Sequence, residues 1–185
     1  MESPHPEPAE IVAGRLQLRP FLPRDVEGVY AACQDADIQR WTTVPAPYRR
    51  AHAEGYVRDN SLAGWEEGAG RSYAVTDATT GDLLGTIGLV EYDADEQIAE
   101  IGYWVSPGAR GRGVATQATT AMARWCFGAL GVARLQWAAE VGNEASRRVA
   151  LRAGFTVEGV LRDRIRARDG SRADAWVGSL LPRDL

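Results

Sequence analysis

The chain of 185 residues contains no lysine, so each of its 21 basic residues is an arginine. This absence excludes the P-loop, a nucleotide-binding motif that ends in Gly-Lys-Ser/Thr and contacts phosphate through its lysine. The chain therefore cannot form a P-loop.

Cysteine and histidine are scarce, with two of each. Cys33 and Cys126 lie far apart in apolar, helical contexts, which argues against a disulfide framework and predicts two buried thiols. His5 and His52 are isolated, so they form no cluster for a metal ion and no catalytic pair with a serine. We therefore expect no metal.

No apolar run approaches the roughly 18 residues of a membrane span. The first residues are acidic and proline-rich, whereas a secretory signal is basic and then apolar, so residues 1–11 are interpreted as a flexible tail. The length and the apolar fraction of 45% predict a single domain over residues 12–182. We expect a cytoplasmic protein without a membrane partner.

Charge is divided unevenly along the chain. Residues 1–104 hold 8 arginines and 18 acidic residues, whereas residues 105–185 hold 13 arginines and 7 acidic residues. The basic half suits a polyanionic ligand and the acidic half suits a cationic one, although both faces could simply be solvated. The acidic whole, with a net charge of −4, disfavours nucleic acid as a partner.

Alternating and periodic patterns predict an α/β protein with a mixed, mostly antiparallel sheet flanked by helices. A hairpin is expected around Asp169-Gly170. The expected strands are 15–20, 71–76, 83–92, 97–105, 135–141, 156–167 and 173–181, and the expected helices are about 25–34, about 49–66, one from 114 and a short one after Asn143.

A glycine-rich turn separates the strand that ends near Val105 from the helix that begins near Val114. The glycines place the unpaired first amides of this helix beside an open loop, a geometry that binds anions such as phosphate. A Rossmann fingerprint would use Gly111 and Gly113, but its third glycine position is Thr116. Glu140, at the end of the next strand, keeps that alternative open.

The segment Arg110-x-x-Gly113-x-Ala115 resembles the pyrophosphate-binding pattern of the GNAT N-acyltransferase superfamily. Downstream, Asn143, Ser146 and the pair Gly154-Phe155 occur in the order of the second half of the GNAT coenzyme site. Each of these three could also be an ordinary helix cap, first-turn residue or helix stop.

The amino-acid sequences of three segments resemble those of the Rim-type branch of the GNAT superfamily, whose members acetylate protein N-terminal amines. They are Glu100 to Trp104, Asn143 to Ser146 and Arg15 to Pro20, and the resemblance covers about residues 12–182. It implies a GNAT fold, acetyl-CoA as cosubstrate and direct attack of an amine on the thioester. The implied coenzyme-binding residues are Val105, Arg110, Gly111, Arg112, Gly113, Val114, Ala115, Thr116, Asn143 and Ser146.

The resemblance also implies catalytic roles. The main-chain amide near Val105 would stabilise the oxyanion. The tyrosine that protonates the leaving thiolate in many GNAT proteins is replaced here by Ala150, and Ser146 matches the residue that Rim-type enzymes use instead. A thiol with a pKa near 8.5 is a tolerable leaving group, so a hydrogen-bond donor suffices.

No general base is obvious from the sequence. Glu100 and Asp163 each occupy an otherwise apolar strand face and are the candidates, although pairing with arginine explains either equally well. An α-amine has a pKa near 8 and a lysine side chain a pKa near 10.4, so a weaker base suffices to deprotonate the α-amine. The candidates for the acceptor pocket are Trp41, Tyr48 and Tyr103. The alternative for each is ordinary packing in the core or at its rim.

The sequence therefore predicts an acetyl-CoA-dependent N-acetyltransferase for a protein N-terminal amine or a small amine. A GNAT-fold module that binds acyl-CoA without catalysis stays open, as does a Rossmann-like NAD-binding enzyme. The choice between a monomer and a homodimer is open as well.

Overall fold

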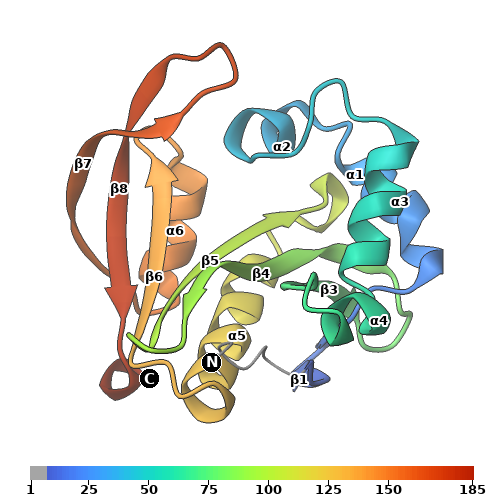
Figure 1. Cartoon of the computed structure of the whole chain (residues 1–185), viewed down its shortest axis with the longest axis horizontal. Coiled ribbons are helices and arrows are strands. Elements are labelled where there is room, and N and C mark those ends of the chain that lie inside the picture. The colour runs from blue at the N-terminus through green and yellow to red at the C-terminus, as the bar shows by residue number, and fades with distance from the viewer. Residues whose placement is uncertain (1–7) are drawn as a thin grey trace.

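The computed structural model describes residues 8–185, within which eight strands form one sheet (Figure 1). The strand order is β1-β2-β3-β4-β5-β6-β8-β7, and every neighbouring pair is antiparallel except β5 and β6. The strands are β1 (Ile11–Ala13), β2 (Leu16–Arg19), β3 (Ser72–Asp77), β4 (Leu83–Asp93), β5 (Ile98–Val105), β6 (Arg134–Glu140), β7 (Thr156–Arg166) and β8 (Arg172–Leu180). The prediction of a mixed, mostly antiparallel sheet is confirmed.

Helices cover both faces of this sheet (Figure 1). The α-helices are α1 (Val26–Ala32), α2 (Ala36–Trp41), α3 (Arg50–Asp59), α4 (Leu62–Glu66), α5 (Val114–Ala129) and α6 (Glu144–Arg152). Short 3-10 turns are η1 (Pro23–Asp25), η2 (Pro107–Ala109) and η3 (Pro182–Asp184). Within residues 8–185, no helix combines the length and apolarity that crossing a bilayer requires.

The prediction of one long helix over residues 49–66 is wrong, because the chain forms two helices there, α3 and α4. Asn60 ends α3 and uses its side-chain oxygen to accept hydrogen bonds from the amides of Arg71 (3.0 Å) and Ser72 (2.8 Å). Ser61 then caps α4 by accepting from the Gly64 amide at 3.2 Å. The break therefore ties the end of α3 to the start of β3.

Two further elements lie where the sequence predicted none. β1 includes Ile11, the last residue of the expected tail, and Ala9 donates its amide to the Tyr73 hydroxyl at 3.1 Å. The rest of that tail, residues 1–7, lies outside the described part of the chain. α2 begins after Asp35, whose carboxylate accepts from the Ile38 amide at 3.0 Å. It is too short to show a helical period in the sequence.

The two parallel strands touch over only a short length. Pairing between β5 and β6 is confined to Ile98 with Arg134, Ala99 with Leu135, and Glu100 with Gln136. Beyond these pairs the strands diverge, and α2 lies near the open end (Figure 1). The result is a V-shaped gap in the middle of the sheet.

The apolar core is divided between the two faces. Successive side chains of a strand point to opposite faces, so Ile101 belongs to the same buried cluster as Met122 of α5. Trp104 belongs to the other cluster, with Val29 of α1 and Val57 of α3. Both predicted thiols, Cys33 and Cys126, are free and buried, as expected.

Candidate functional site

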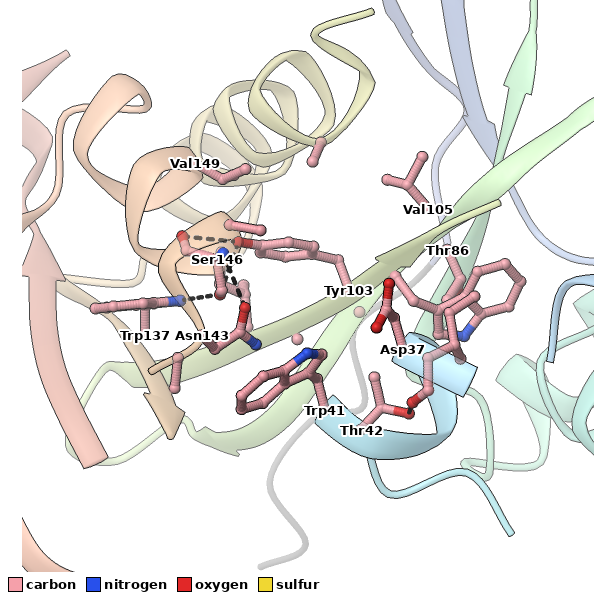
Figure 2. A pocket seen from close by; sticks show the side chains of 18 of the residues that line it. Asp37, Trp41, Thr42, Thr86, Tyr103, Val105, Trp137, Asn143, Ser146 and Val149 are labelled. Carbon is pink, nitrogen blue, oxygen red and sulfur yellow. Dashed lines mark hydrogen bonds between the residues drawn. The ribbon is translucent and has the colours of Figure 1, made fainter. Parts of the chain in front are cut away.

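A cavity of about 900 Å³ occupies the gap between β5 and β6. Its lining comes from both parts of the sheet and from α2, α3, α5 and α6, as the close view in Figure 2 shows for part of it. Among the residues 8–185, no group of three or more histidine, cysteine or acidic side chains is arranged to hold a metal ion.

The glycine-rich loop forms one wall of this cavity. Gly111 and Gly113 have φ angles of 73° and 76°, a left-handed region that other residues enter only with strain. Gly113 is the N-cap of α5, which runs for 16 residues to Ala129. The amides of the first turn of α5 and the positive end of its dipole therefore face the loop, which makes an anion site.

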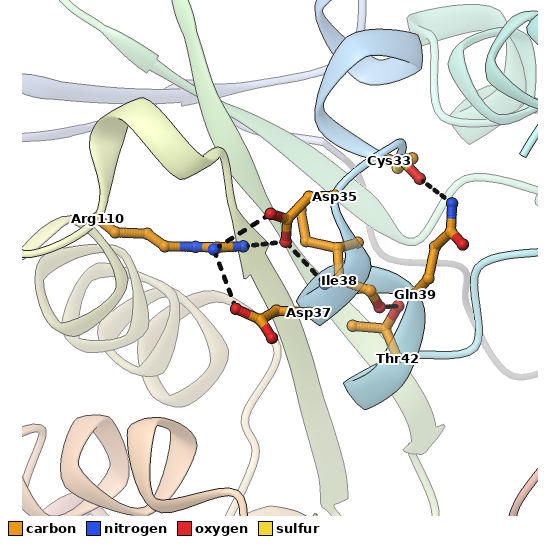
Figure 3. A network of polar contacts seen from close by, with 7 residues as sticks. All are labelled: Cys33, Asp35, Asp37, Ile38, Gln39, Thr42 and Arg110. Atoms are coloured by element: carbon orange, nitrogen blue, oxygen red, sulfur yellow. Dashed lines mark hydrogen bonds and ion pairs between the residues drawn. The ribbon is translucent and has the colours of Figure 1, made fainter.

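Arg110 precedes these glycines and lies in the cavity wall. Figure 3 shows its side chain directed at Asp35 and Asp37. Its guanidinium donates to the Asp35 carboxylate at 2.5 Å and is 3.5 Å from that of Asp37. The hydrogen bond from Arg110 lowers the pKa of Asp35. Arg112, by contrast, is exposed and is not among the residues that line the cavity.

Ser146 is the centre of a hydrogen-bonded cluster (Figure 2). Its hydroxyl accepts from the Trp137 indole N–H at 3.0 Å and lies 3.1 Å from the Tyr103 hydroxyl. The Asn143 side chain caps α6 by accepting from the Ser146 amide at 3.1 Å. Burial raises the pKa of Tyr103 to about 12, so its phenol stays protonated. When the Tyr103 hydroxyl donates to Ser146, the Ser146 hydrogen is left for a group in the cavity.

The main-chain N–H of Val105 points into the gap. Its neighbour Ser106 donates its amide to the Leu84 carbonyl of β4 at 2.8 Å. Alternate residues of an antiparallel strand direct their N–H groups to opposite edges, so Val105 directs its own toward β6. Because β6 has separated by this point, the amide is available to a ligand.

Glu100 lies at the closed end of the gap, on the opposite face of β5 from Tyr103. Its side chain is 15% exposed, and Arg164 Nη2 is 3.9 Å from its carboxylate. Burial raises the pKa of Glu100, against the opposing effect of Arg164. It is thus a cavity-lining carboxylate with an elevated affinity for protons.

The other candidates fall in different places. Asp163 is exposed and does not line the cavity, because a register shift between Leu161 and Ile165 and its own φ of 53° interrupt the alternation of β7. Tyr48 is buried in the core beside α1 and α3, away from the cavity. Trp41 lines the cavity from the end of α2 (Figure 2).

Sequence reasoning missed the contribution of Trp137 and of the acidic residues of α2. In the sequence, Trp137 is one apolar residue of an alternating strand. The residues around it do not indicate that its indole N–H donates to Ser146. Asp35 carries a visible signal, because an aspartate three residues before an apolar residue is a helix-cap pattern.

Comparison with known proteins places this arrangement in a family. The model of the acetyltransferase (GNAT) domain matches residues 15–156. The "Uncharacterized N-acetyltransferase YoaA" of Bacillus subtilis (strain 168) is 29% identical over 171 residues, 92% of this chain and 96% of the relative. The "Ribosomal-protein-serine acetyltransferase" of Escherichia coli (strain K12) is 33% identical over 81 residues, 44% of this chain and 45% of the relative.

A solved structure agrees with this fold. The microcin C7 self immunity acetyltransferase MccE, in complex with acetyl-CoA and AMP, has a TM-score of 0.77 and 22% identity, over 91% of this chain and 93% of that one. The chain belongs to the GNAT acetyltransferase family. It is an N-acetyltransferase. The mostly antiparallel sheet rules out the Rossmann alternative, which requires a doubly wound parallel sheet.

Proposed function

We propose that this enzyme acetylates a primary amine, either a protein N-terminal amine or a small amine, while both substrates are bound together. The observation that carries the proposal is the gap between β5 and β6. The anion-binding loop and Ser146 border it on the side of α5 and α6, and Glu100 borders it on the side of α1 and α3. The two substrates can then meet in the gap from opposite faces of the sheet.

The residues of the loop fit the coenzyme. A pyrophosphate needs donors and close main-chain approach, and a Cβ at Gly111 would meet nothing within 4 Å, so the loop is open to a ligand. Arg110 supplies a cation once it exchanges its aspartates for phosphate. The remaining proposed contacts are Arg112, Val114, Ala115, Thr116 and Asn143, of which Arg112 would act from outside the cavity wall.

Two donors would stabilise the charges of the reaction. The N–H of Val105 would donate to the thioester oxygen as it becomes negative, and the Ser146 hydroxyl would donate to the departing sulfur. Tyr103 and Trp137 would hold Ser146 in place through the hydrogen bonds described above. Tyr103 is thereby reassigned from acceptor binding to positioning.

Glu100 would accept the proton that the amine must lose. A raised pKa brings a carboxylate closer to neutral pH, where it is a more effective base, and its position opposite Ser146 separates the two proton transfers. Trp41 would pack against the acceptor from α2. Asp163 keeps no part in this proposal because it lies outside the cavity.

The test is direct. Acetyl-CoA binding is measured by calorimetry, and free-thiol release is followed with a panel of N-terminal peptides and small amines, with acetylated products identified by mass. Binding with thiol release on an amine supports the proposal. Binding without release on any amine would instead favour a module that binds acyl-CoA without catalysis.

A further inference from the structure

A row of small residues crosses the sheet on the face of α1 and α3. Ser72 of β3 is paired with Gly88 of β4, and Gly88 is paired with Gly102 of β5. The two glycines have no side chains, so this row forms a depression that runs from the gap as far as Ser72, which together with the Arg71 carbonyl closes it over Gly88. We name these three residues the glycine trough.

Larger side chains form the walls of the glycine trough. Thr86 and Trp104, the next pair along β4 and β5, stand on one side with Tyr56 of α3. Glu100 and Val90 stand on the other, since a Cβ on Gly102 would come within 2.8 Å of a Val90 methyl. The trough and these walls belong to the same cavity as Ser146.

The polar groups at the far end have a defined direction of hydrogen bonding. Thr86 donates its only hydrogen to the Tyr73 carbonyl at 2.9 Å, so the Tyr56 hydroxyl, 2.9 Å from Thr86, must be the donor between those two. Burial raises the pKa of Tyr56, so its phenol stays protonated and able to donate. The Ser72 hydroxyl lines the same cavity and carries two acceptor lone pairs.

The position of the Ser72 hydroxyl determines how far apart the two polar groups of a bound ligand must be. A Cβ built on Gly88 would lie 2.3 Å from Ser72 Oγ, so this oxygen overhangs the trough at Gly88. An amine that reacts in the gap lies beside Gly102, one strand spacing of about 4.8 Å away. A ligand spanning both points would need polar groups roughly 5–7 Å apart.

We propose that the glycine trough is the acceptor subsite and that it selects amines carrying a second amino group about 6 Å from the reacting nitrogen. This rests on the proposed function. The second amino group would donate to Ser72 Oγ, and the walls supply aromatic faces and the carboxylate of Glu100, which suit a cation. The same chemistry is offered by a small diamine or by a peptide whose first side chain carries an amine.

The experiment compares matched acceptors. kcat/KM is measured for 1,5-diaminopentane and 1-aminopentane, and for peptides that begin with lysine or with its apolar analogue norleucine. We expect a preference of about tenfold for the acceptor with the second amino group, after correction for the two equivalent amines of the diamine. The peptide pair separates a peptide source from a small-molecule source of this chemistry.

Variants of the trough locate the effect. Ser72→Ala should reduce the preference to about one, because it lowers kcat/KM for 1,5-diaminopentane, the acceptor whose second amino group donates to Ser72 Oγ. Gly102→Ala should slow both amines by filling the trough, and the exposed side chain of Val90 must shift to admit the new methyl, which would lie 2.8 Å from it. Gly128→Ala, which meets nothing within 4 Å and lies on the exposed end of α5, is the matched control and should change neither amine.

A binding measurement separates failure of the subsite from failure of the reaction. Both amines are titrated by calorimetry into protein saturated with coenzyme A. Tighter binding of the diamine that is lost in Ser72→Ala supports the subsite even where no amine is acetylated, and that absence of turnover would count against the proposed function alone. Equal binding of the two amines, or a preference that survives in Ser72→Ala, would overturn the subsite.

Discussion

Arg110 and Asp35 form a bidentate contact that links the coenzyme loop to the cap of α2, with N···O distances of 2.5 and 3.4 Å (Figure 3). The same guanidinium is the cation proposed to bind coenzyme phosphate, so the aspartates of α2 compete with the coenzyme. Coenzyme binding and the position of α2 should therefore be linked.

Asp35→Asn should tighten acetyl-CoA binding about two- to fivefold, the range expected for loss of a partly exposed ion pair. Asparagine keeps a side-chain oxygen to cap α2 at Ile38, so the helix should persist. Calorimetry measures the affinity, and Arg110→Gln provides the opposite case, with weaker binding. Weaker binding by Asp35→Asn would mean that the aspartate orients Arg110 for the coenzyme and does not compete with it.

Gly113→Ala should raise the Kd for acetyl-CoA about tenfold. A φ of 76° costs an alanine about 1–2 kcal/mol, and the loop can relieve this strain only by moving its amides. Gly108→Ala is the matched control, because Gly108 lies in the same loop, has no positive φ and would place its Cβ in open space. Equal affinities of the two variants would contradict the prediction.

Ser146→Ala should lower kcat about 10²-fold and leave the Kd for acetyl-CoA within about twofold of the wild type. The α6 cap survives, because Asn143 accepts from the main-chain amide of residue 146. Trp137→Phe keeps an aromatic ring and removes the donor, and a fall of about tenfold or less is expected. A kcat that is unchanged in Ser146→Ala would remove this hydroxyl from the mechanism.

The activity of the wild type should fall at acidic pH as Glu100 becomes protonated. Because burial raises its pKa, the midpoint should lie above the ordinary glutamate value of about 4.3. Glu100→Gln should lose this part of the pH profile of kcat/KM. Glu91 raises the pKa of Glu100 through its charge, so Glu91→Gln should move the midpoint to lower pH. An unmoved midpoint in both variants would assign the titration to another group.

Asp25→Ala should cost about 3–5 kcal/mol in the free energy of unfolding. Asp25 pairs with Arg19 at 2.7 Å with both side chains buried, and it also accepts from the Leu22 amide at 2.7 Å. Its removal leaves a buried guanidinium without a counter-charge. Urea unfolding measures the change, and Glu27→Gln, which breaks an exposed pair with Arg50, should cost at most about 1 kcal/mol.

The sequence was most informative where function depends on local chain geometry. The loop from Arg110 to Thr116 and the cap at Asn143 are short patterns in which backbone conformation and residue type determine each other. The structure accordingly brings Arg110, Gly111, Gly113 and Asn143 to the cavity.

Sequence reasoning was weakest where the path of the chain in three dimensions determines whether a side chain reaches the cavity. Trp41 and Tyr48 are aromatic residues close together in the sequence, yet Trp41 lines the cavity and Tyr48 is buried in the core. For Asp163, strict alternation along a strand predicted an inward side chain, and an irregularity of β7 turned it outward. The glycine trough depends on the register of three strands, which no single segment encodes.

The three residue pairs that join β5 to β6 leave two strand edges facing each other inside the molecule. An unpaired edge on a protein surface invites aggregation, but these edges are enclosed by helices and become attachment points for a ligand. What they offer is peptide N–H and C=O groups, which every residue has. Substitution of the surrounding side chains can therefore alter which acceptor is used while the means of holding the coenzyme stays intact.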